Sequence, residues 1–202
     1  MSTCRWARRN VAGIVLNGGL SRRMGTEKGA IRLGGHSLLE RTLDVLAGLF
    51  DEVLVVGRPG ACPPHPALSQ TLADAVPGAG PLGGIVTGLG AMAAPYGFVV
   101  ACDMPCLDPA VVRRQLEVLR RSPADAVVPC WDGYWEPLHA LYARACLPPA
   151  RRRLGAGDRR IRSFFPHVRL RLWDVRAEGI GPRPFINVNT KSDLAALLGA
   201  DP

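Results

Sequence analysis

The segment that runs from Leu16 to Lys28 combines glycines with cations directly after an apolar run. Gly18 and Gly19 allow the backbone to approach a ligand closely and to turn N–H groups toward an anion. Arg22, Arg23 and Lys28 follow, and such side chains clamp polyphosphates. We therefore predict a polyphosphate-binding loop, although the same residues are compatible with a solvated turn. The G-x-x-x-x-G-K-[ST] pattern of a P-loop is absent.

A carboxylate follows a second apolar run. Phe98–Cys102 is typical of a buried strand, and Asp103 comes directly after it. At this position a carboxylate can hold Mg²⁺ against a triphosphate, because Mg²⁺ prefers hard oxygen ligands. The alternative is that Asp103 caps the next helix, but Asp108 is better placed for that because Pro109 follows it. We predict Asp103 as the metal ligand.

The elements that must position these residues alternate along the chain. Strands are expected at 11–16, 52–56, 98–102, 124–129, 138–142 and 170–175, and helices at 36–50, 82–94, 108–121 and 192–198. This order predicts an α/β fold with three layers, in which a doubly wound, mostly parallel, Rossmann-like sheet lies between helices. We expect one domain over residues 1–202, with residues 1–10 flexible. Ligands of such sheets bind outside the carboxyl ends of the strands.

Composition narrows the class of function. The net charge of +8 suits an anionic ligand, but aromatic residues make up only 6% and do not alternate with basic ones, which disfavours nucleic-acid binding. The six cysteines form no C-x-x-C pair, so we expect reduced thiols rather than disulfides or a zinc site. No apolar run approaches the ~20 residues that span a membrane, and the basic N-terminus lacks a signal-peptide cleavage site. We expect a cytoplasmic protein that binds no membrane.

The glycines at 78, 80 and 83 also fit the G-x-G-x-x-G pattern of dinucleotide-binding proteins, with Asp103 as the acidic residue 20 positions later. We reject this interpretation. Residues 70–76 make a poor strand, because Ala73 and Asp74 stand where a buried strand needs branched residues, and Pro81 lies inside the turn.

The first loop resembles a family signature. Residues 16–28 fit L-x-G-G-x-S-x-R-M-G-x-x-K, which is similar to the GT-A-like nucleotidyltransferases and especially to the molybdenum cofactor guanylyltransferases of the MobA-like NTP transferase family. The resemblance implies that Leu16, Asn17, Gly18 and Gly19 border the base and phosphates of an NTP and that Lys28 contacts the phosphates. Asn17 replaces the usual Ala of the family, next to the base-binding backbone.

Three further segments resemble the same family in the same order. Residues 74–85, DAVPGAGPLGGI, imply that Asp74 contacts guanine and that Gly80, Pro81 and Leu82 border the nucleotide. C-D-M-P at 102–105 implies that Asp103 binds Mg²⁺ and the NTP phosphates. In F-I-N-V-N-T at 185–190, strand alternation puts Asn187 and Asn189 on one face, and the resemblance implies a role next to the acceptor or the metal. The family usually has Ala at Gly83 and Pro at Lys191.

The acceptor side is less defined. Residues 136–142, EPLHALY, resemble the strand that flanks the acceptor site in the family, and there we expect His139 to be structural rather than a catalytic base. The six arginines between Arg151 and Arg162 either contact a phosphorylated acceptor or form a plain solvated surface.

The resemblance implies a Mg²⁺-dependent enzyme that transfers GMP from GTP to the phosphate of molybdopterin, releasing pyrophosphate and forming molybdopterin guanine dinucleotide. Lys28, Arg23 and Asp103 are then the catalytic residues, and no general base is needed because a phosphate is already ionised at neutral pH. Proteins of molybdenum cofactor biosynthesis and recipient molybdoenzymes are the implied partners. The alternatives are a molybdopterin cytidylyltransferase, a sugar-phosphate nucleotidyltransferase, and a non-catalytic carrier of the cofactor on the same fold.

Overall fold

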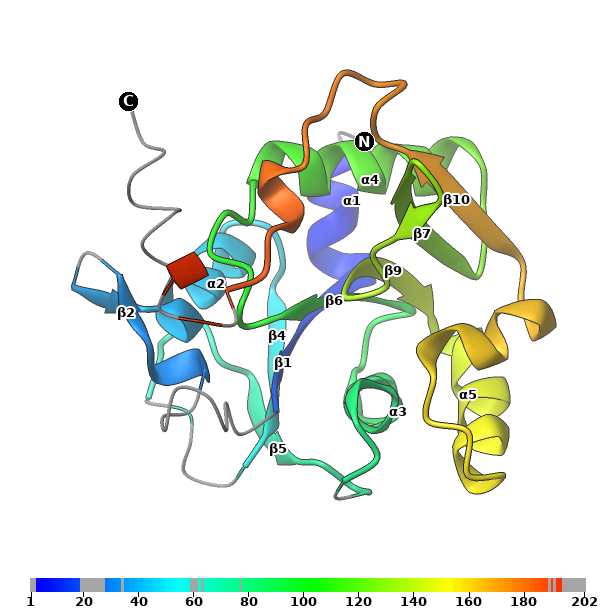
Figure 1. Ribbon diagram of the computed structural model, residues 1–202, viewed down its shortest axis with the longest axis horizontal. Coiled ribbons are helices and arrows are strands. Elements are labelled where there is room, and N and C mark those ends of the chain that lie inside the picture. The colour runs from blue at the N-terminus through cyan, green and yellow to red at the C-terminus, as the bar shows by residue number, and fades with distance from the viewer. Residues whose placement is uncertain are drawn as a thin grey trace.

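A mixed, mostly parallel sheet forms the centre of the protein (Figure 1). The computed structural model describes residues 3–18, 28–33, 35–58, 62, 64–76, 78–188, 190 and 192–193. In this part of the chain the main sheet has eight strands in the order β10-β7-β9-β6-β1-β4-β5, with β8 paired to β7. The strands are β1 Val11–Asn17, β4 Glu52–Gly57, β5 Gln70–Ala73, β6 Tyr96–Ala101, β7 Ala126–Trp131, β8 Tyr134–Trp135, β9 His139–Ala143 and β10 Leu170–Asp174. β9 runs antiparallel to both of its neighbours.

Helices cover both faces of this sheet. One face carries α1 (Thr3–Asn10), α2 (Leu38–Ala47) and α4 (Pro109–Arg121), and the other carries α3 (Pro81–Ala91) and α5 (Leu147–Gly155). A two-stranded hairpin, β2 (Arg32–Leu33) with β3 (His36–Ser37), precedes α2. Short 3₁₀ helices lie at Lys28–Ala30, Arg144–Cys146, Ile161–His167 and Arg183–Phe185. The predicted three-layer α/β fold is confirmed.

The core follows from the alternation of side chains along each strand. All seven residues of β1 are buried, with Val11 and Val15 in the cluster on the α2 and α4 side and Ile14 in the cluster on the α3 side. Gly88 brings α3 directly onto β1, since a Cβ there would lie 2.5 Å from Cγ2 of Ile14. Strand β1 is therefore central, and its carboxyl end is fixed from both sides.

Two helices begin directly after a residue that caps their N-terminus. Ser37 caps α2 in a capping box, in which its side chain accepts from the Glu40 N–H and the Glu40 carboxylate accepts from the Ser37 N–H. The helix therefore starts at Leu38 rather than at residue 36. Asp108 caps α4 as expected, with its carboxylate accepting from the Ala110 N–H at 2.7 Å.

The structure corrects two expectations. Residues 3–10, expected to be flexible, form α1, which is held because Ala7 is buried and Trp6 packs against Tyr96. The segment from residue 70, judged a poor strand, forms β5, which pairs in parallel with β4. β5 lies at the edge of the sheet with largely exposed residues, so it does not need the branched side chains of a buried strand.

Two further features bear on the environment of the protein. All six cysteines are free, as expected. Among the described residues, no helix has the length and apolar character needed to cross a membrane.

Candidate active site

The residues that the sequence singled out gather at the carboxyl edge of the parallel strands. Leu16 is aligned with Ala101 of β6 on one side and Val56 of β4 on the other. The Cys102 N–H donates to the Leu16 carbonyl at 3.1 Å, one residue beyond the ends of this pairing. Asp103 therefore emerges beside Asn17 and Gly18, although 85 positions separate Asp103 from Gly18 in the sequence.

The segment near the C-terminus is attached to the same point. The Val188 N–H donates to the backbone carbonyl of Asp103 at 2.8 Å, and Val188 is buried against Ile31, Leu33 and Leu38. This contact brings Asn187 to the end of β6. Asp103 is only 8% exposed, so it is largely shielded from solvent at this edge.

Glu136 is a second carboxylate at this point, to which the sequence analysis assigned no role of its own. It is 3% exposed and lies just before β9, which runs antiparallel to β6 and thus starts where β6 ends. The Leu138 N–H and the Tyr134 hydroxyl donate to its two oxygens at 3.0 and 3.3 Å. Burial raises the pKa of Glu136 and the charge of Asp103 acts in the same direction, while hydrogen bonds, including one from the Asn187 amide, oppose this. In the sequence, the signal that could have identified Glu136 is an acidic residue before Pro137 within a largely apolar segment.

Asp74 follows β5 at the opposite end of the same edge. Its Oδ1 accepts from the Val76 N–H at 3.1 Å and from the Thr87 hydroxyl at 3.4 Å, which anchors the carboxylate on α3. A Cβ at Gly83 would lie 3.1 Å from Asp74 Oδ1 and 2.8 Å from the Ala79 Cβ. The glycine at this position, where the family usually has Ala, therefore leaves room for Asp74 to lie against the first turn of α3.

Helix α3 points its N-terminus at this edge. Gly80 precedes it with φ 69° and ψ −162°, a conformation that only glycine adopts readily, and Pro81 occupies the first turn. Gly80 has no side chain to cap the helix, Pro81 has no N–H, and the Gly83 N–H donates to the Gly80 carbonyl at 3.1 Å, so the Leu82 N–H is left for a ligand, and the helix dipole favours an anion there. Gly80, Pro81 and Leu82 thus border the space next to Asp74.

The Asn17 side chain turns toward the 3₁₀ helix that begins at Lys28. It is 8% exposed, and a Cβ added at Gly29 would overlap its Oδ1. Asn17 thus packs against the backbone next to Lys28. The other residues predicted for this loop lie outside the described part of the chain: Gly19, Arg22, Arg23 and the Lys28 side chain. The same is true of Asn189 and of the helix expected at 192–198 beyond residue 193.

His139 does not reach the site surface. It is fully buried, and its ring centroid lies 5.0 Å from that of Phe98 and 4.9 Å from that of Phe185, both in edge-on contact. Burial lowers the pKa of His139 to about 4, so the ring is neutral at pH 7. A neutral, buried ring between two phenylalanines fits the structural role expected from the sequence.

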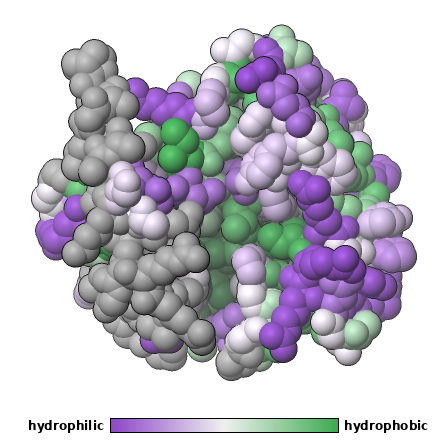
Figure 2. Space-filling model, viewed as in Figure 1, coloured by the Kyte–Doolittle hydropathy of each residue, from purple (hydrophilic) through white to green (hydrophobic). Residues whose placement is uncertain are grey.

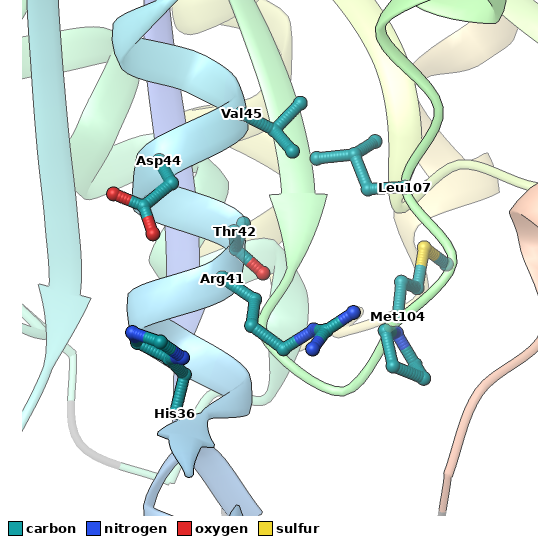
Figure 3. Close-up of a pocket in the computed structure, with 8 residues that line it drawn as sticks. His36, Arg41, Thr42, Asp44, Val45, Met104 and Leu107 are labelled. Carbon is teal, nitrogen blue, oxygen red and sulfur yellow. The ribbon is translucent and has the colours of Figure 1, made fainter. Parts of the chain in front are cut away.

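A pocket of about 270 Å³ lies between α2 and the loop that follows Asp103 (Figure 3). Its lining includes His36, Arg41 and Asp44 from α2 and its approach, and Met104 and Leu107 from the loop. In Figure 3 the guanidinium of Arg41 extends toward Met104, whereas the Asp44 carboxylate points away from the loop. Met104 and Pro105, which follow Asp103, line this pocket, whereas Asp103 and Glu136 do not.

The oxygen donors at the edge fit a hard divalent cation. The carboxylates of Asp103 and Glu136 and the amide of Asn187 provide oxygen atoms, which is the ligand type that Mg²⁺ prefers. No group of three or more His, Cys, Asp and Glu side chains that could hold a metal by themselves occurs within the residues described. Such a sparse set suits Mg²⁺ bound jointly by one or two carboxylates and substrate phosphates, rather than a cage made of protein alone.

Comparison with known proteins identifies the family. Residues 13–172 match the model of the MobA-like NTP transferase domain. The chain belongs to this family. It is 38% identical over 198 residues to a probable molybdenum cofactor guanylyltransferase of Chloroflexus aggregans, covering 91% of each chain. It is 32% identical over 185 residues to the molybdenum cofactor guanylyltransferase of Syntrophotalea carbinolica, covering 90% of this chain and 87% of that protein.

Solved structures agree with this assignment. Molybdopterin-guanine dinucleotide biosynthesis protein A from Archaeoglobus fulgidus superimposes with a TM-score of 0.77 at 26% identity, over 92% of this chain and 95% of that chain. The 2-C-methyl-D-erythritol 4-phosphate cytidylyltransferase of Thermus thermophilus has a TM-score of 0.67 at 21% identity, over 93% of this chain and 98% of that one. The second likeness concerns the fold alone. Family membership also excludes the dinucleotide-binding interpretation of Gly78, Gly80 and Gly83, even though a strand does precede them.

Proposed function

We propose that this member of the MobA-like NTP transferase family transfers GMP from GTP to the phosphate of molybdopterin, releasing pyrophosphate. The observation that carries the proposal is the position of Asp103 beside the end of β1, fixed by the hydrogen bond from the Cys102 N–H to the Leu16 carbonyl. This contact supports the proposal that the buried residue Asp103, beside Asn17 and Gly18, lies where an NTP triphosphate would bind. The names of the relatives supply the donor and the acceptor.

The base would lie between Asp74 and the start of α3. Guanine presents two adjacent donors, N1–H and the N2 amino group, and a carboxylate accepts both in a bidentate arrangement. Cytosine has an acceptor nitrogen beside its amino group, and this nitrogen would face the same carboxylate unfavourably. The position of Asp74, anchored by Thr87, therefore favours GTP over CTP.

The reaction requires an oxygen of the acceptor phosphate to form a bond with the α-phosphorus of GTP while the bond to the pyrophosphate oxygen breaks. Two anions must approach each other, so alignment and neutralisation of charge dominate the barrier. Asp103 would hold Mg²⁺, with Asn187 and Glu136 beside it, and Mg²⁺ would supply charge neutralisation at the triphosphate. Lys28, Arg22 and Arg23 are the proposed cations on the donor side.

No proton needs to be removed from the acceptor, because a phosphate is ionised at neutral pH. The burial of His139 is compatible with this, since a fully buried ring cannot reach the substrates. The cytoplasm is the proposed compartment, which the six free cysteines suit. Recipient molybdoenzymes and other proteins of the same biosynthesis are the proposed protein partners.

The first test is calorimetric titration of GTP and then CTP in the presence of Mg²⁺, with wild type and Asp103→Asn. Asn keeps the shape of the side chain and removes the charge. We expect GTP to bind preferentially. In a separate assay of dinucleotide formation, Asp103→Asn should lower the turnover number by about 100-fold or more with little change in melting temperature. Normal Mg²⁺-dependent turnover in Asp103→Asn would contradict the assignment of the metal ligand. Preferential binding of CTP would transfer the proposal to the cytidylyltransferase.

A further inference from the structure

The arginine-rich segment after α5 divides into arginines with different surroundings. Arg153 and Arg160 both form ion pairs with Asp158, at 3.0 and 2.8 Å. These two guanidinium groups hold the pKa of Asp158 well below its usual range. Arg159 donates to the Gly78 carbonyl at 2.8 Å and so ties this segment to the loop that precedes α3. These three side chains have partners within the protein.

Arg162 is arranged differently. Its Cζ lies 4.5 Å from the ring centroid of Trp135, so the guanidinium group is held over the aromatic ring. The Trp135 ring is stacked in turn with Phe165, at 6.1 Å between centroids and 26° between planes. An arginine on an aromatic ring keeps N–H groups at its edge for hydrogen bonds to an anion, and little side-chain freedom is left to lose on binding. Arg162 is exposed, and this edge can therefore meet a ligand from solvent.

This platform adjoins the site residue Glu136. Trp135 lies between Tyr134 and Glu136, and the Tyr134 hydroxyl donates to Glu136 at 3.3 Å. In Figure 2 this face of the molecule is hollowed, with hydrophobic surface at its floor and hydrophilic residues along the side formed by α5 and the segment after it.

The binding of two anions explains why a cation is required where the acceptor phosphate lies. The acceptor phosphate and the GTP triphosphate are both anions, so each needs a positive partner before they can approach each other. Cations in the predicted donor loop would be engaged by the GTP triphosphate. The phosphate that attacks therefore needs a positive group of its own.

We propose that Arg162, held on Trp135, binds the non-reacting phosphate oxygens of the acceptor and so determines its affinity and orientation. This inference rests on the proposed function and deepens it, because it assigns the phosphate monoester of the acceptor to one residue. Arg162 contacts the acceptor phosphate. Arg153, Arg159 and Arg160, which have partners within the protein, hold the segment around Arg162 in place.

The test is steady-state kinetics of the full chain with GTP, Mg²⁺ and molybdopterin under anaerobic conditions, measured as dinucleotide formed. Arg162→Gln is compared with Arg162→Lys and with Arg152→Gln, which removes the same charge from an exposed position of α5. We expect Arg162→Gln to raise the KM for molybdopterin about 10- to 100-fold, the loss of a charge-assisted contact, with the KM for GTP unchanged. The KM of Arg162→Lys for molybdopterin should lie between those of wild type and Arg162→Gln, since lysine keeps the charge but lacks the planar guanidinium group. The KM values of Arg152→Gln should match those of wild type.

The outcomes separate the inference from the function on which it rests. If wild type forms the dinucleotide but Arg162→Gln leaves the molybdopterin KM unchanged, the inference is wrong and the function stands. A rise in the GTP KM equal to that for molybdopterin also overturns it, because Arg162 would then serve the nucleotide. If wild type forms no dinucleotide, the proposed function fails and the inference fails with it. If the melting temperature shows that Arg162→Gln does not fold, Arg162→Lys is used instead. A rise in its KM for molybdopterin relative to its KM for GTP supports the inference, and an unchanged ratio overturns it.

Discussion

Replacing His139 by leucine should change the response of the protein to acid. Leu has a similar volume and cannot take up a proton. The His139 side chain has no exposed surface and lies between Phe98 and Phe185, and neither ring nitrogen has a hydrogen-bond partner among the described residues. Leucine therefore leaves no hydrogen bond broken. The substitution removes a titrating group, because burial lowers the pKa of His139 from 6.5 to about 4.

The magnitude follows from that difference of about 2.5 pKa units. Between pH 6.5 and pH 4 the unfolded chain binds a proton at residue 139 that the folded protein excludes, so the folded state loses stability as the pH falls. Each unit corresponds to about 1.36 kcal/mol, so the whole window corresponds to about 3 kcal/mol. By pH 5 the wild type should have lost about 2 kcal/mol from this residue, and above pH 6.5 the contribution is fully present.

The assay is urea unfolding of wild type and His139→Leu at a series of pH values between 8 and 5, followed by tryptophan fluorescence. The difference in free energy of unfolding between the two proteins should shift by about 2 kcal/mol in favour of the variant over this range, whatever its value at pH 8. Other titrating groups are common to both proteins and cancel. Parallel pH profiles would refute the argument that His139 is buried in its neutral form. The variant should also keep its turnover number at pH 8, and a large loss there would indicate a catalytic role for His139.

Two other predictions concern the glycine before α3 and the buried thiol. Gly80→Ala forces φ 69° on an alanine, so it should cost about 1–3 kcal/mol of stability and weaken GTP binding. The control is Gly155→Ala, where an added Cβ meets no atom within 4 Å, and this variant should be neutral or stabilising. Equal melting temperatures for the two variants would contradict the strain at Gly80. Burial raises the pKa of the Cys146 thiol to about 12, whereas Cys4 is exposed. Iodoacetamide added to the folded protein at pH 8 should therefore alkylate Cys4 and leave Cys146 unmodified, as measured by mass spectrometry. Comparable labelling of the two residues would show that Cys146 is accessible as a thiolate.

The strands at the centre of the sheet were predictable from sequence, and the elements at its margins were not. β1 and β6 are continuous apolar runs because both of their faces are covered, and this leaves a strong local signal. β5 has one neighbour and mostly exposed residues, so its composition is that of a loop, and its strand geometry comes from hydrogen bonds to β4. Likewise α1 is short and basic, and it is held by the contacts of Trp6 and Ala7 with distant parts of the chain.

The sequence by itself determined the order of the main elements, the position of Asp103 at the end of a buried strand, and the segments that resemble the MobA-like NTP transferases. These are local properties, set by residue type and spacing within about ten residues. Only the tertiary structure decided that Glu136 lies beside Asp103, that Asp74 rests against Gly83, and that Arg162 alone of its neighbours is held over Trp135. The pairing of an antiparallel β9 with β6 brings Glu136 to the site, and side-chain contacts between segments sort the arginines. Pairings of this kind join residues far apart in the chain, and no local pattern encodes them.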